Sequence, residues 1–241
     1  MTQTSSDADC PKELLIDADF LIYSVGFASE EDSEKFAKSR LVETMEDMIY
    51  IHLKATSYEA FLTGKNNYRY EIAKTVPYKG NRKDTQKPKH YDALREHMVK
   101  RLGAVIVDGQ EADDEVAIRM SKEPDKYLLV GVDKDLRQIP GWHHNPHKAL
   151  TEYIDDFTAY KNFCTQLLTG DRVDNIPGLA GIGPKKAEKA LAEATTREEL
   201  LEVVWMVYQE KEQAIEYLTE QGQLLWLRRT EGELWQPSGL S

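Results

Sequence analysis

The stretch ELLIDADFLIY, at residues 13–23, decides the fold of this chain. Its first apolar residues predict a short buried β-strand that ends near Asp17. Apolar runs at residues 58–63, 104–107 and 127–132 predict three more strands, and residues 34–56, 91–102 and 113–121 predict helices between them. Strands that alternate with helices are typical of a mainly parallel sheet. We therefore expect an α/β domain whose central sheet is flanked by helices.

The remainder of the chain divides by pattern. From about residue 155 the sequence becomes helical and is interrupted by the glycine-rich residues 178–183. We expect an α/β core at residues 12–154, a helical module at residues 155–205 and a C-terminal segment, residues 206–241, that packs on the core. Residues 1–11 are polar and acidic, without the apolar stretch of a signal peptide, and predict a disordered leader.

The composition excludes some classes of protein. Hydrophobic residues make up 41% of the 241 residues, but no stretch approaches the roughly 18–20 apolar residues of a membrane span. Only Cys10 and Cys164 are present, which favours reduced thiols and a cytoplasmic protein. The net charge of −11 argues at first against nucleic acid. Many of the carboxylates are clustered, however, so a basic DNA track beside an acidic metal pocket is compatible with this total.

Four carboxylate clusters lie where strands end or helices begin. They are Asp17 with Asp19, Glu111 with Asp113 and Asp114, Asp133 with Asp135, and Asp171 with Asp174. Ligands bind at the carboxyl ends of parallel strands, so the first three clusters converge on one crevice if the strands are neighbours. Crowded carboxylates must protonate or bind cations, and hard oxygen ligands suit Mg²⁺ or Mn²⁺. Two such ions activate a water for attack on a phosphodiester.

A structural role is the alternative for each cluster taken alone, because Asp is common at helix N-termini and after strands. It is favoured for Asp19 and Asp114 within the clusters. Asp155 and Asp156 form a further pair that is better explained as a helix start. Four clusters together favour the metal-binding interpretation.

Two further segments indicate nucleic-acid binding. Residues 74–90 (KTVPYKGNRKDTQKPKH) carry six Lys or Arg and one acid, which suits a phosphate-binding loop, and Tyr78 is a candidate for stacking on an unpaired base. The string GLAGIGPKKAEKAL begins with glycines that allow a tight turn, followed by Pro184 at a helix start. Backbone N–H groups at that start would bind phosphate without reading bases. A solvated charged loop and an ordinary helical turn are the alternatives.

Some signals are discounted. His143, His144 and His147 in GWHHNPH favour a plain surface turn over a zinc site, since proline is present and cysteine partners are absent. Trp226 and Trp235 are expected to pack in the core. Neither a phosphate-binding P-loop nor a nucleophile elbow is present.

Taken together, the strings DADFLIY, NNYR, VPYKGNRK, EADDE, VDKDLRQIP and TGDRVDNIPGLAGIGPKKAEKAL resemble the 5′→3′ exonuclease and flap endonuclease family. They run in family order over residues 14–191 and look most like the stand-alone phage enzymes. The resemblance implies a PIN-like α/β core with a basic arch near residues 77–101, and a helix–three-turn–helix DNA-binding module. It also implies two Mg²⁺ or Mn²⁺ ions, and a K⁺ ion at the glycine turn.

The resemblance assigns roles to particular residues. The metal-site acids are Asp17, Glu111, Asp113, Asp114, Asp133, Asp135, Asp171 and Asp174. Lys79 and Arg82 match the residues that engage the scissile phosphate, and Tyr78 precedes them as the family aromatic does. The DNA-binding residues are Lys83, Gly181, Gly183, Lys185, Lys186 and Lys189. The implied substrates are DNA with 5′ ends, flaps or nicks, and RNA primers in hybrids.

One departure from the family pattern concerns the strand at residues 58–62. The family places a metal-binding aspartate after it, where this chain has Gly64. An active nuclease of phage DNA replication, acting as a monomer in the host cytoplasm beside replication proteins, is the first hypothesis. A catalytically weakened module that grips branched DNA is the second. A PIN-type RNase is a third, against which the glycine turn argues.

Overall fold

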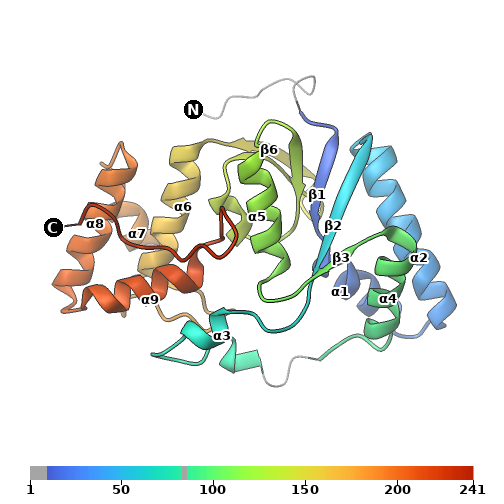
Figure 1. Cartoon of the computed structure of the whole chain (residues 1–241), viewed down its shortest axis with the longest axis horizontal. Helices are drawn as coiled ribbons and strands as arrows, with labels where there is room; N and C mark the ends of the chain where they lie inside the picture. The colour runs from blue at the N-terminus through green and yellow to red at the C-terminus, as the bar shows by residue number, and fades with distance from the viewer. Residues whose placement is uncertain (1–9, 83–85, 241) are drawn as a thin grey trace.

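The computed structural model describes residues 10–82 and 86–240. Within these ranges six strands form one sheet in the order β3-β2-β1-β4-β5-β6 (Figure 1). They are β1 (Glu13–Asp17), β2 (Ser57–Thr63), β3 (Val105–Val107), β4 (Tyr127–Val130), β5 (Gly141–Asn145) and β6 (Leu150–Ile154). All neighbouring strands are parallel except β5 and β6. The predicted α/β fold class, with a mainly parallel sheet, is confirmed.

Helices cover the sheet and extend beyond one end of it (Figure 1). The core helices are α1 (Asp19–Ala28), α2 (Glu34–Glu46), α4 (Tyr91–Leu102) and α5 (Ala112–Lys122), with a short α3 (Arg69–Ile72) below the sheet. The end of the molecule away from α2 and α4 is built by α6 (Asp156–Thr169), α7 (Pro184–Ala190), α8 (Arg197–Glu210) and α9 (Ile215–Leu225). No helix of the described chain is long and apolar enough to cross a membrane.

The alternating side chains of the central strands explain these layers. Leu14 and Ile16 of β1 pack in the cluster formed with α1, α2 and α4, whereas Leu15 points to the other face and packs with α5. Successive strand residues point to opposite faces, so a strand that is apolar throughout must be covered on both sides. The buried apolar residues of β1, 14–16, and of β4 therefore lie at the centre of a three-layer core.

Two helical predictions were refined by the structure. The helix expected at residues 34–56 is shorter in the structure. It forms α2, which ends at Glu46, and a π-helical turn follows at Asp47–His52. Asp155 caps α6 by accepting a hydrogen bond from the Thr158 N–H at 2.7 Å, so the expected helix start is confirmed.

The expected boundary between the helical module and the C-terminal segment, at residue 205, falls inside α8. The expected leader lies mostly on residues outside those described.

The expected surface turn at GWHHNPH is wrong. Residues 141–145 form β5, which pairs with β4 on one side and with β6 on the other. His143 is 7% exposed, and its Nε2 lies 2.7 Å from the Ile139 carbonyl. His and Asn carry little strand signal, so pairing and burial, rather than local preference, make this strand. As expected, Trp226 and Trp235 pack in the helical end, against Phe163.

A buried ion pair joins the core to the C-terminal segment. The Arg69 guanidinium donates to both carboxylate oxygens of Asp114, at 2.5 and 2.9 Å, and both side chains are almost fully buried. Arg69 also donates to the carbonyls of Leu224 and Trp226, at 2.9 and 3.0 Å. Residues from three distant parts of the sequence therefore meet at one guanidinium.

Replacing Arg69 tests this junction. We expect Arg69→Met to lower the free energy of unfolding by about 3–5 kcal/mol, because it leaves the buried Asp114 carboxylate without a partner. The exposed Arg119→Met serves as control and should cost about 1 kcal/mol or less. Urea unfolding measures both. A loss for Arg69→Met no larger than the control's would contradict the structural role.

His143 predicts a pH dependence of stability. Burial lowers the pKa of His143 to about 4, against an ordinary value of 6.5. Below pH 6.5, His143 is therefore protonated in the unfolded chain, whereas in the folded chain it stays neutral down to about pH 4. The free energy of unfolding falls as the pH is lowered through this window. Relative to His143→Gln, the wild type should lose roughly 2–3 kcal/mol between pH 7.5 and 4. Urea unfolding at several pH values checks this, with His147→Gln as the exposed control. Parallel pH profiles for wild type and His143→Gln would overturn it.

Candidate metal and phosphate site

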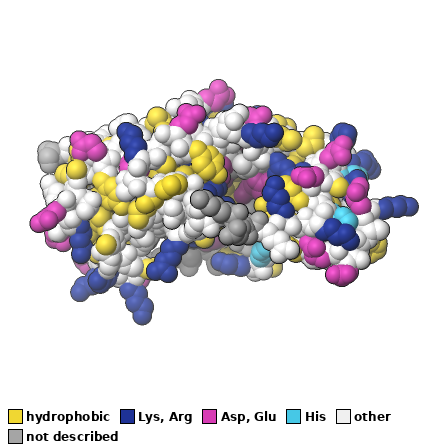
Figure 2. Space-filling view, turned by 90° about the horizontal axis from the view of Figure 1, so that it is seen from below, with side chains coloured by type: hydrophobic (Ala, Val, Ile, Leu, Met, Phe, Trp, Pro, Cys, Tyr) yellow, Lys and Arg dark blue, Asp and Glu magenta, His cyan; other side chains and the backbone are white. Residues whose placement is uncertain are grey.

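The carboxyl ends of β1 and β4 open into an acidic hollow. Because these strands are parallel neighbours, Asp17 at the end of β1 lies beside the loop that follows β4. The hollow has a volume of about 290 Å³. It is lined by Asp17, Asp19, Tyr23, Thr63, Gly64, Lys79, Arg82, Tyr91, Arg95, Glu111, Asp113, Asp133, Asp135 and Asp174. Figure 2 shows acidic side chains set into this face of the molecule, with Lys and Arg side chains around them.

Six of the eight acids assigned to the metal site line this hollow: Asp17, Glu111, Asp113, Asp133, Asp135 and Asp174. Asp171 lies next to it, 2% exposed, and pairs with Lys134 at 2.7 Å. Asp114 does not line the hollow; its buried carboxylate pairs with Arg69 and accepts from the Glu111 N–H. The structural role favoured for Asp114 by its position at a helix start agrees with this placement.

The central acids of the hollow crowd against one another more than against cations. Among the described residues, Asp17, Asp113, Asp133 and Asp135 form no salt bridge. Burial, reinforced by Asp19 and Asp133, raises the pKa of Asp17 to about 8. Burial together with Asp133 raises the pKa of Asp135 to about 7, and burial with Asp114 and Glu111 raises that of Asp113. Such crowding favours protons or bound cations.

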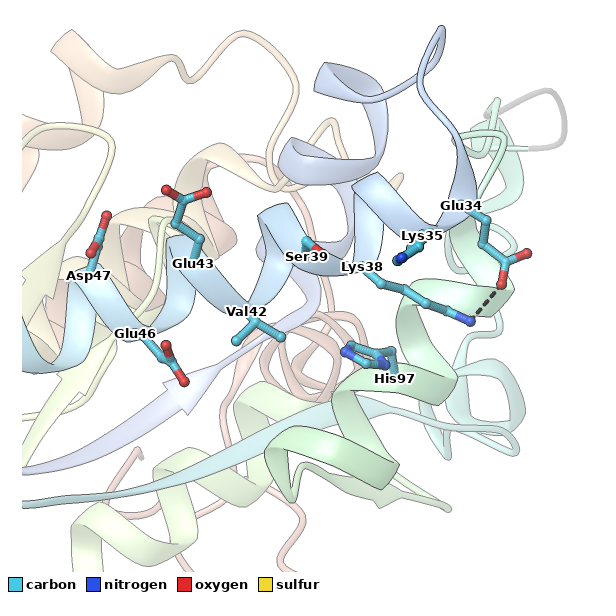
Figure 3. Close-up of a pocket in the computed structure, with 9 residues that line it drawn as sticks. All are labelled: Glu34, Lys35, Lys38, Ser39, Val42, Glu43, Glu46, Asp47 and His97. Carbon is cyan, nitrogen blue, oxygen red and sulfur yellow. Dashed lines mark hydrogen bonds and ion pairs between the residues drawn. The ribbon is translucent and has the colours of Figure 1, made fainter.

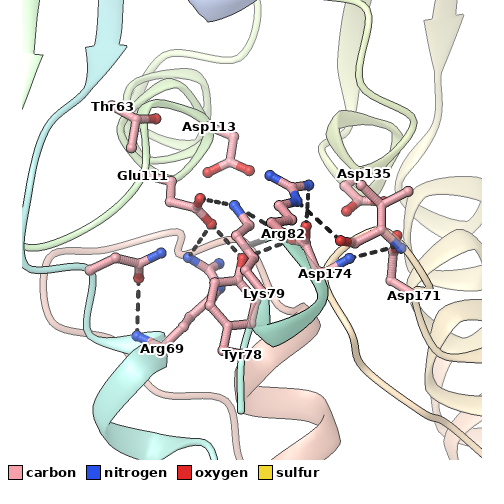
Figure 4. Close-up of polar contacts among 12 residues, drawn as sticks. Thr63, Arg69, Tyr78, Lys79, Arg82, Glu111, Asp113, Asp135, Asp171 and Asp174 are labelled. Carbon is pink, nitrogen blue, oxygen red and sulfur yellow. Dashed lines mark hydrogen bonds and ion pairs between the residues drawn. The ribbon is translucent and has the colours of Figure 1, made fainter. Parts of the chain in front are cut away.

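The rim acids, in contrast, are paired with the basic segment (Figure 4). Lys79 Nζ contacts Glu111 Oε1, and Arg82 Nη2 lies 2.6 Å from Asp174 Oδ1. Burial alone would raise the pKa of Glu111, but Lys79 and Arg69 more than offset it and lower that pKa. Lys79 has φ +52° and its N–H donates to the Asp174 carbonyl at 2.8 Å, so the backbone fixes where this lysine points. Lys83 lies outside the described residues.

Tyr78 does not take the position expected of a base-stacking residue. It is 3% exposed, and its hydroxyl lies 2.6 Å from Glu111 Oε2 and 2.8 Å from Asp174 Oδ2. A buried phenol needs a hydrogen-bond partner, and this carboxylate pair supplies one. In this arrangement the Tyr78 hydroxyl contacts both acids, and its ring is buried within the protein.

The end of β2 contributes backbone and hydroxyl groups instead of a carboxylate. The Thr63 hydroxyl accepts from the Ala112 N–H at 3.0 Å, and the Thr63 N–H donates to Asp19 Oδ2 at 3.0 Å. A side chain at Gly64 would clash with the Asp108 carboxylate and the Val107 carbonyl. The close approach of β3 therefore excludes any acid at position 64. The carboxylates at this edge are Asp108, which accepts from the Lys65 N–H at 2.7 Å, and Asp19.

The donor set fits hard divalent cations by its chemistry. Asp17, Asp113, Asp133 and Asp135 offer carboxylate oxygens that form no salt bridge with a described residue, and carboxylate oxygens are the ligands that Mg²⁺ and Mn²⁺ take from proteins. Within the described ranges, no group of three or more His, Cys, Asp or Glu side chains is arranged to hold an ion in the present rotamers.

The glycine turn leads into a row of exposed lysines. Gly178 and Gly181 have φ values of +60° and +77°, which favour glycine, and Gly183 is the N-cap of α7 with Pro184 at its first position. Lys185, Lys186 and Lys189 are exposed on this short helix. The Lys186 ammonium donates to the Gly181 carbonyl at 2.8 Å. The sequence placed these residues correctly around a turn and a helix start.

Several residues of the hollow were missed from the sequence. Arg95 of α4 donates to Asp19 Oδ1 at 2.9 Å and to the Thr63 carbonyl at 2.6 Å, and Tyr23 and Tyr91 line the same wall. Helix α4 carried no motif, so only the folded chain brings Arg95 to the site. Lys134, which lies between two of the predicted acids, could have been suspected from its position alone.

A larger hollow of about 610 Å³ lies over α2 and α4 (Figure 3). It is open and lined by side chains of both charges, among them Glu34, Lys38 and His97. The Lys38–Glu34 pair at 2.6 Å closes one end. None of the predicted acids reaches it, so size alone does not make it the functional site.

Comparisons with known proteins define the class. The resemblance to 5′→3′ exonucleases and flap endonucleases is confirmed, and the fold is that of a 5′-nuclease with a six-stranded, mostly parallel sheet. No protein-family model matches the chain. The D15 protein of bacteriophage T5, crystallised with metal ions, matches with a TM-score of 0.65 at 17% identity, over 88% of each chain. The T5 D15 flap endonuclease in a complex with DNA and metal ions matches with a TM-score of 0.62 at 18% identity, also over 88% of each chain.

Proteins that are similar to the chain in sequence support the same resemblance. DNA polymerase I of Bacillus caldotenax is 32% identical over 161 residues, 59% of this chain. The chain spans only 18% of the length of that polymerase. The flap endonuclease Xni of a Shewanella species is 28% identical over 198 residues, 75% of this chain and 74% of that protein. A 5′-3′ exonuclease of Mycoplasmopsis pulmonis is 27% identical over 206 residues, 78% of this chain and 68% of that protein.

The charge crowding at Asp17 is testable without substrate. In chelator at pH 7.5, we expect Asp17→Asn to raise the free energy of unfolding by on the order of 2 kcal/mol. Folding of the wild type must hold a proton on Asp17 or keep a buried charge beside Asp19 and Asp133, and the variant avoids both costs. Added Mn²⁺ should stabilise the wild type and stabilise the variant much less. Thermal unfolding measures both, with exposed Asp125→Asn as control. A variant that is less stable than wild type in chelator would contradict the crowding.

Proposed function

We propose that this chain is a divalent-metal-dependent nuclease that hydrolyses DNA backbone phosphodiesters at or near 5′ ends. The observation that carries the proposal is a single hollow lined both by unpaired carboxylates and by Lys79 and Arg82. Carboxylates bind cations and the two basic residues bind phosphate, so the hollow offers both partners that phosphodiester hydrolysis needs. The relatives named as exonucleases and flap endonucleases support the same activity.

The acids of the hollow would hold two ions. Asp17, Glu111 and Asp113 would hold one ion, and Asp133, Asp135, Asp171 and Asp174 would hold the other. When bound, Mg²⁺ or Mn²⁺ would neutralise charge on the phosphate and make water a stronger nucleophile. A T5 relative crystallised with metal ions supports this requirement.

The basic segment would receive the scissile phosphate. Lys79 and Arg82 now pair with Glu111 and Asp174, so their charges are held at the mouth of the hollow. A phosphate entering there would compete for these cations and release the two carboxylates. Lys79 and Arg82 would then stabilise the negative charge of the phosphate during hydrolysis.

The glycine turn and α7 would hold the duplex beside the hollow. Exposed N–H groups and the lysines at residues 185, 186 and 189 suit sequence-independent phosphate contacts. Flaps, nicks and RNA primers in hybrids are the proposed substrates, in phage DNA replication in the host cytoplasm. A monomer, contacts to replication proteins and a K⁺ ion at the turn complete the proposal.

The end of β2 favours a second candidate. Since Thr63 and Gly64 supply no carboxylate, the chain would bind one ion more weakly and serve as a module that grips branched DNA with little cleavage. Binding without cutting distinguishes this candidate from the nuclease.

Cleavage of a 5′-labelled flap and of a nicked duplex tests the proposal. We expect wild type to cut near the junction with Mg²⁺ or Mn²⁺ and not with chelator, and Asp135→Ala to lose cutting while keeping duplex binding, because Asp135 lies in the hollow and away from the glycine turn. The exposed Asp125→Ala is the matched control. Tight binding with no cutting under either metal would contradict the nuclease function and favour the second candidate, the DNA-binding module.

A further inference from the structure

Helix α9 contacts the glycine turn through two side chains. Gln221 Oε1 accepts from the Gly178 N–H at 3.0 Å, and the Tyr217 hydroxyl donates to the Gly178 carbonyl at 2.8 Å. Both polar groups of the residue that begins the turn are therefore fixed by one helix. Gly178 also packs against Gly170 so closely that a Cβ on either would clash with backbone. The turn cannot shift without disturbing α9.

The same helix contacts the segment that leads into the basic residues. Glu220 Oε1 accepts from the N–H groups of Lys74 and Thr75, each at 2.7 Å. Its Oε2 accepts from the Thr75 hydroxyl at 2.6 Å. Thr75 lies four residues before Lys79, so Glu220 anchors the chain just before it enters the hollow. Figure 1 shows α9 running between the helical end and α3.

Stability alone does not explain Gln221. Its side chain is fully buried, and in the described chain its amide nitrogen has no hydrogen-bond partner. A buried unpaired donor destabilises a fold. What the glutamine contributes is the oxygen that accepts from the Gly178 N–H and so holds the turn in position.

From these contacts we propose that α9 sets the distance between the duplex-holding turn and the basic segment, and so determines which phosphodiester enters the hollow. Glu220 and Gln221 are positioning residues in this proposal, since neither lines the hollow. The proposal rests on the nuclease function above and adds that α9 determines the position of the cut. Adjacent residues of one rigid helix hold both ends, so a change at either end alters the register of DNA relative to Lys79 and Arg82.

The test uses Glu220→Ala and Gln221→Leu in the full chain, with Glu216→Ala, an exposed acid on the same helix, as matched control. The readout is the length distribution of products from a 5′-labelled flap and a nicked duplex. We expect wild type and Glu216→Ala to cut at one main phosphate, and both α9 variants to spread their cuts over neighbouring phosphates. Glu220→Gln, which keeps one acceptor oxygen, should restore much of the wild-type pattern.

Binding and exchange measurements complete the test. For Gln221→Leu we expect duplex affinity in chelator to fall by about tenfold, the effect of losing one buried hydrogen bond, and Glu220→Ala to bind nearly as wild type. Amide hydrogen exchange should rise at residues 74–82 in Glu220→Ala and at residues 177–183 in Gln221→Leu.

The outcomes separate the two proposals. If wild type cuts DNA and both variants give the product lengths of Glu216→Ala, the proposed role of α9 in setting the cut position is wrong, and the proposed nuclease function is retained. If wild type does not cut, the nuclease fails, and the exchange data still decide whether α9 fixes the two segments. Exchange that is unchanged in both variants overturns the role of α9 in either case.

Discussion

The buried Arg69–Asp114 pair is the interaction on which the rest of this structure depends. A guanidinium removed from water is costly unless every donor finds a partner. Here the partners are the Asp114 carboxylate at the start of α5 and the carbonyls of Leu224 and Trp226 after α9. The C-terminal segment must therefore close over the core before Arg69 is satisfied. Arg69 stands in α3, just before the basic segment that carries Lys79.

The hollow follows a simple division of charge. Its rim acids are paired with the protein's own cations, Lys79, Arg82 and Lys134, while its central acids form no salt bridge with any described residue. The rim pairs hold the basic segment in place, and the raised pKa values of Asp17 and Asp135 show the cost of leaving the centre unpaired. This local arrangement matters more for function than the net charge of −11, which misleads when taken alone.

Sequence reasoning succeeded where the signal was local and failed where it was not. Apolar runs that end in aspartate predicted β1 and the loop after β4, since strand ends and helix starts are written in neighbouring residues. Strand β5 was missed because GWHHN has no strand pattern and is held by pairing with β4 and β6. The burial of Tyr78, a candidate for stacking on a base, was also not foreseen, because its hydroxyl contacts two carboxylates from distant segments.

The sequence by itself determined the α/β class, the acids at the strand ends, the basic segment and the glycine turn, because each depends on spacing within a few residues. Only the tertiary structure decided which acids share the hollow, that Asp114 is turned away from it, and that Arg95 lines it. It also decided that position 64 has no room for a side chain. The reason is that burial, pairing and close backbone approach arise between segments far apart in the chain, and no local pattern records them.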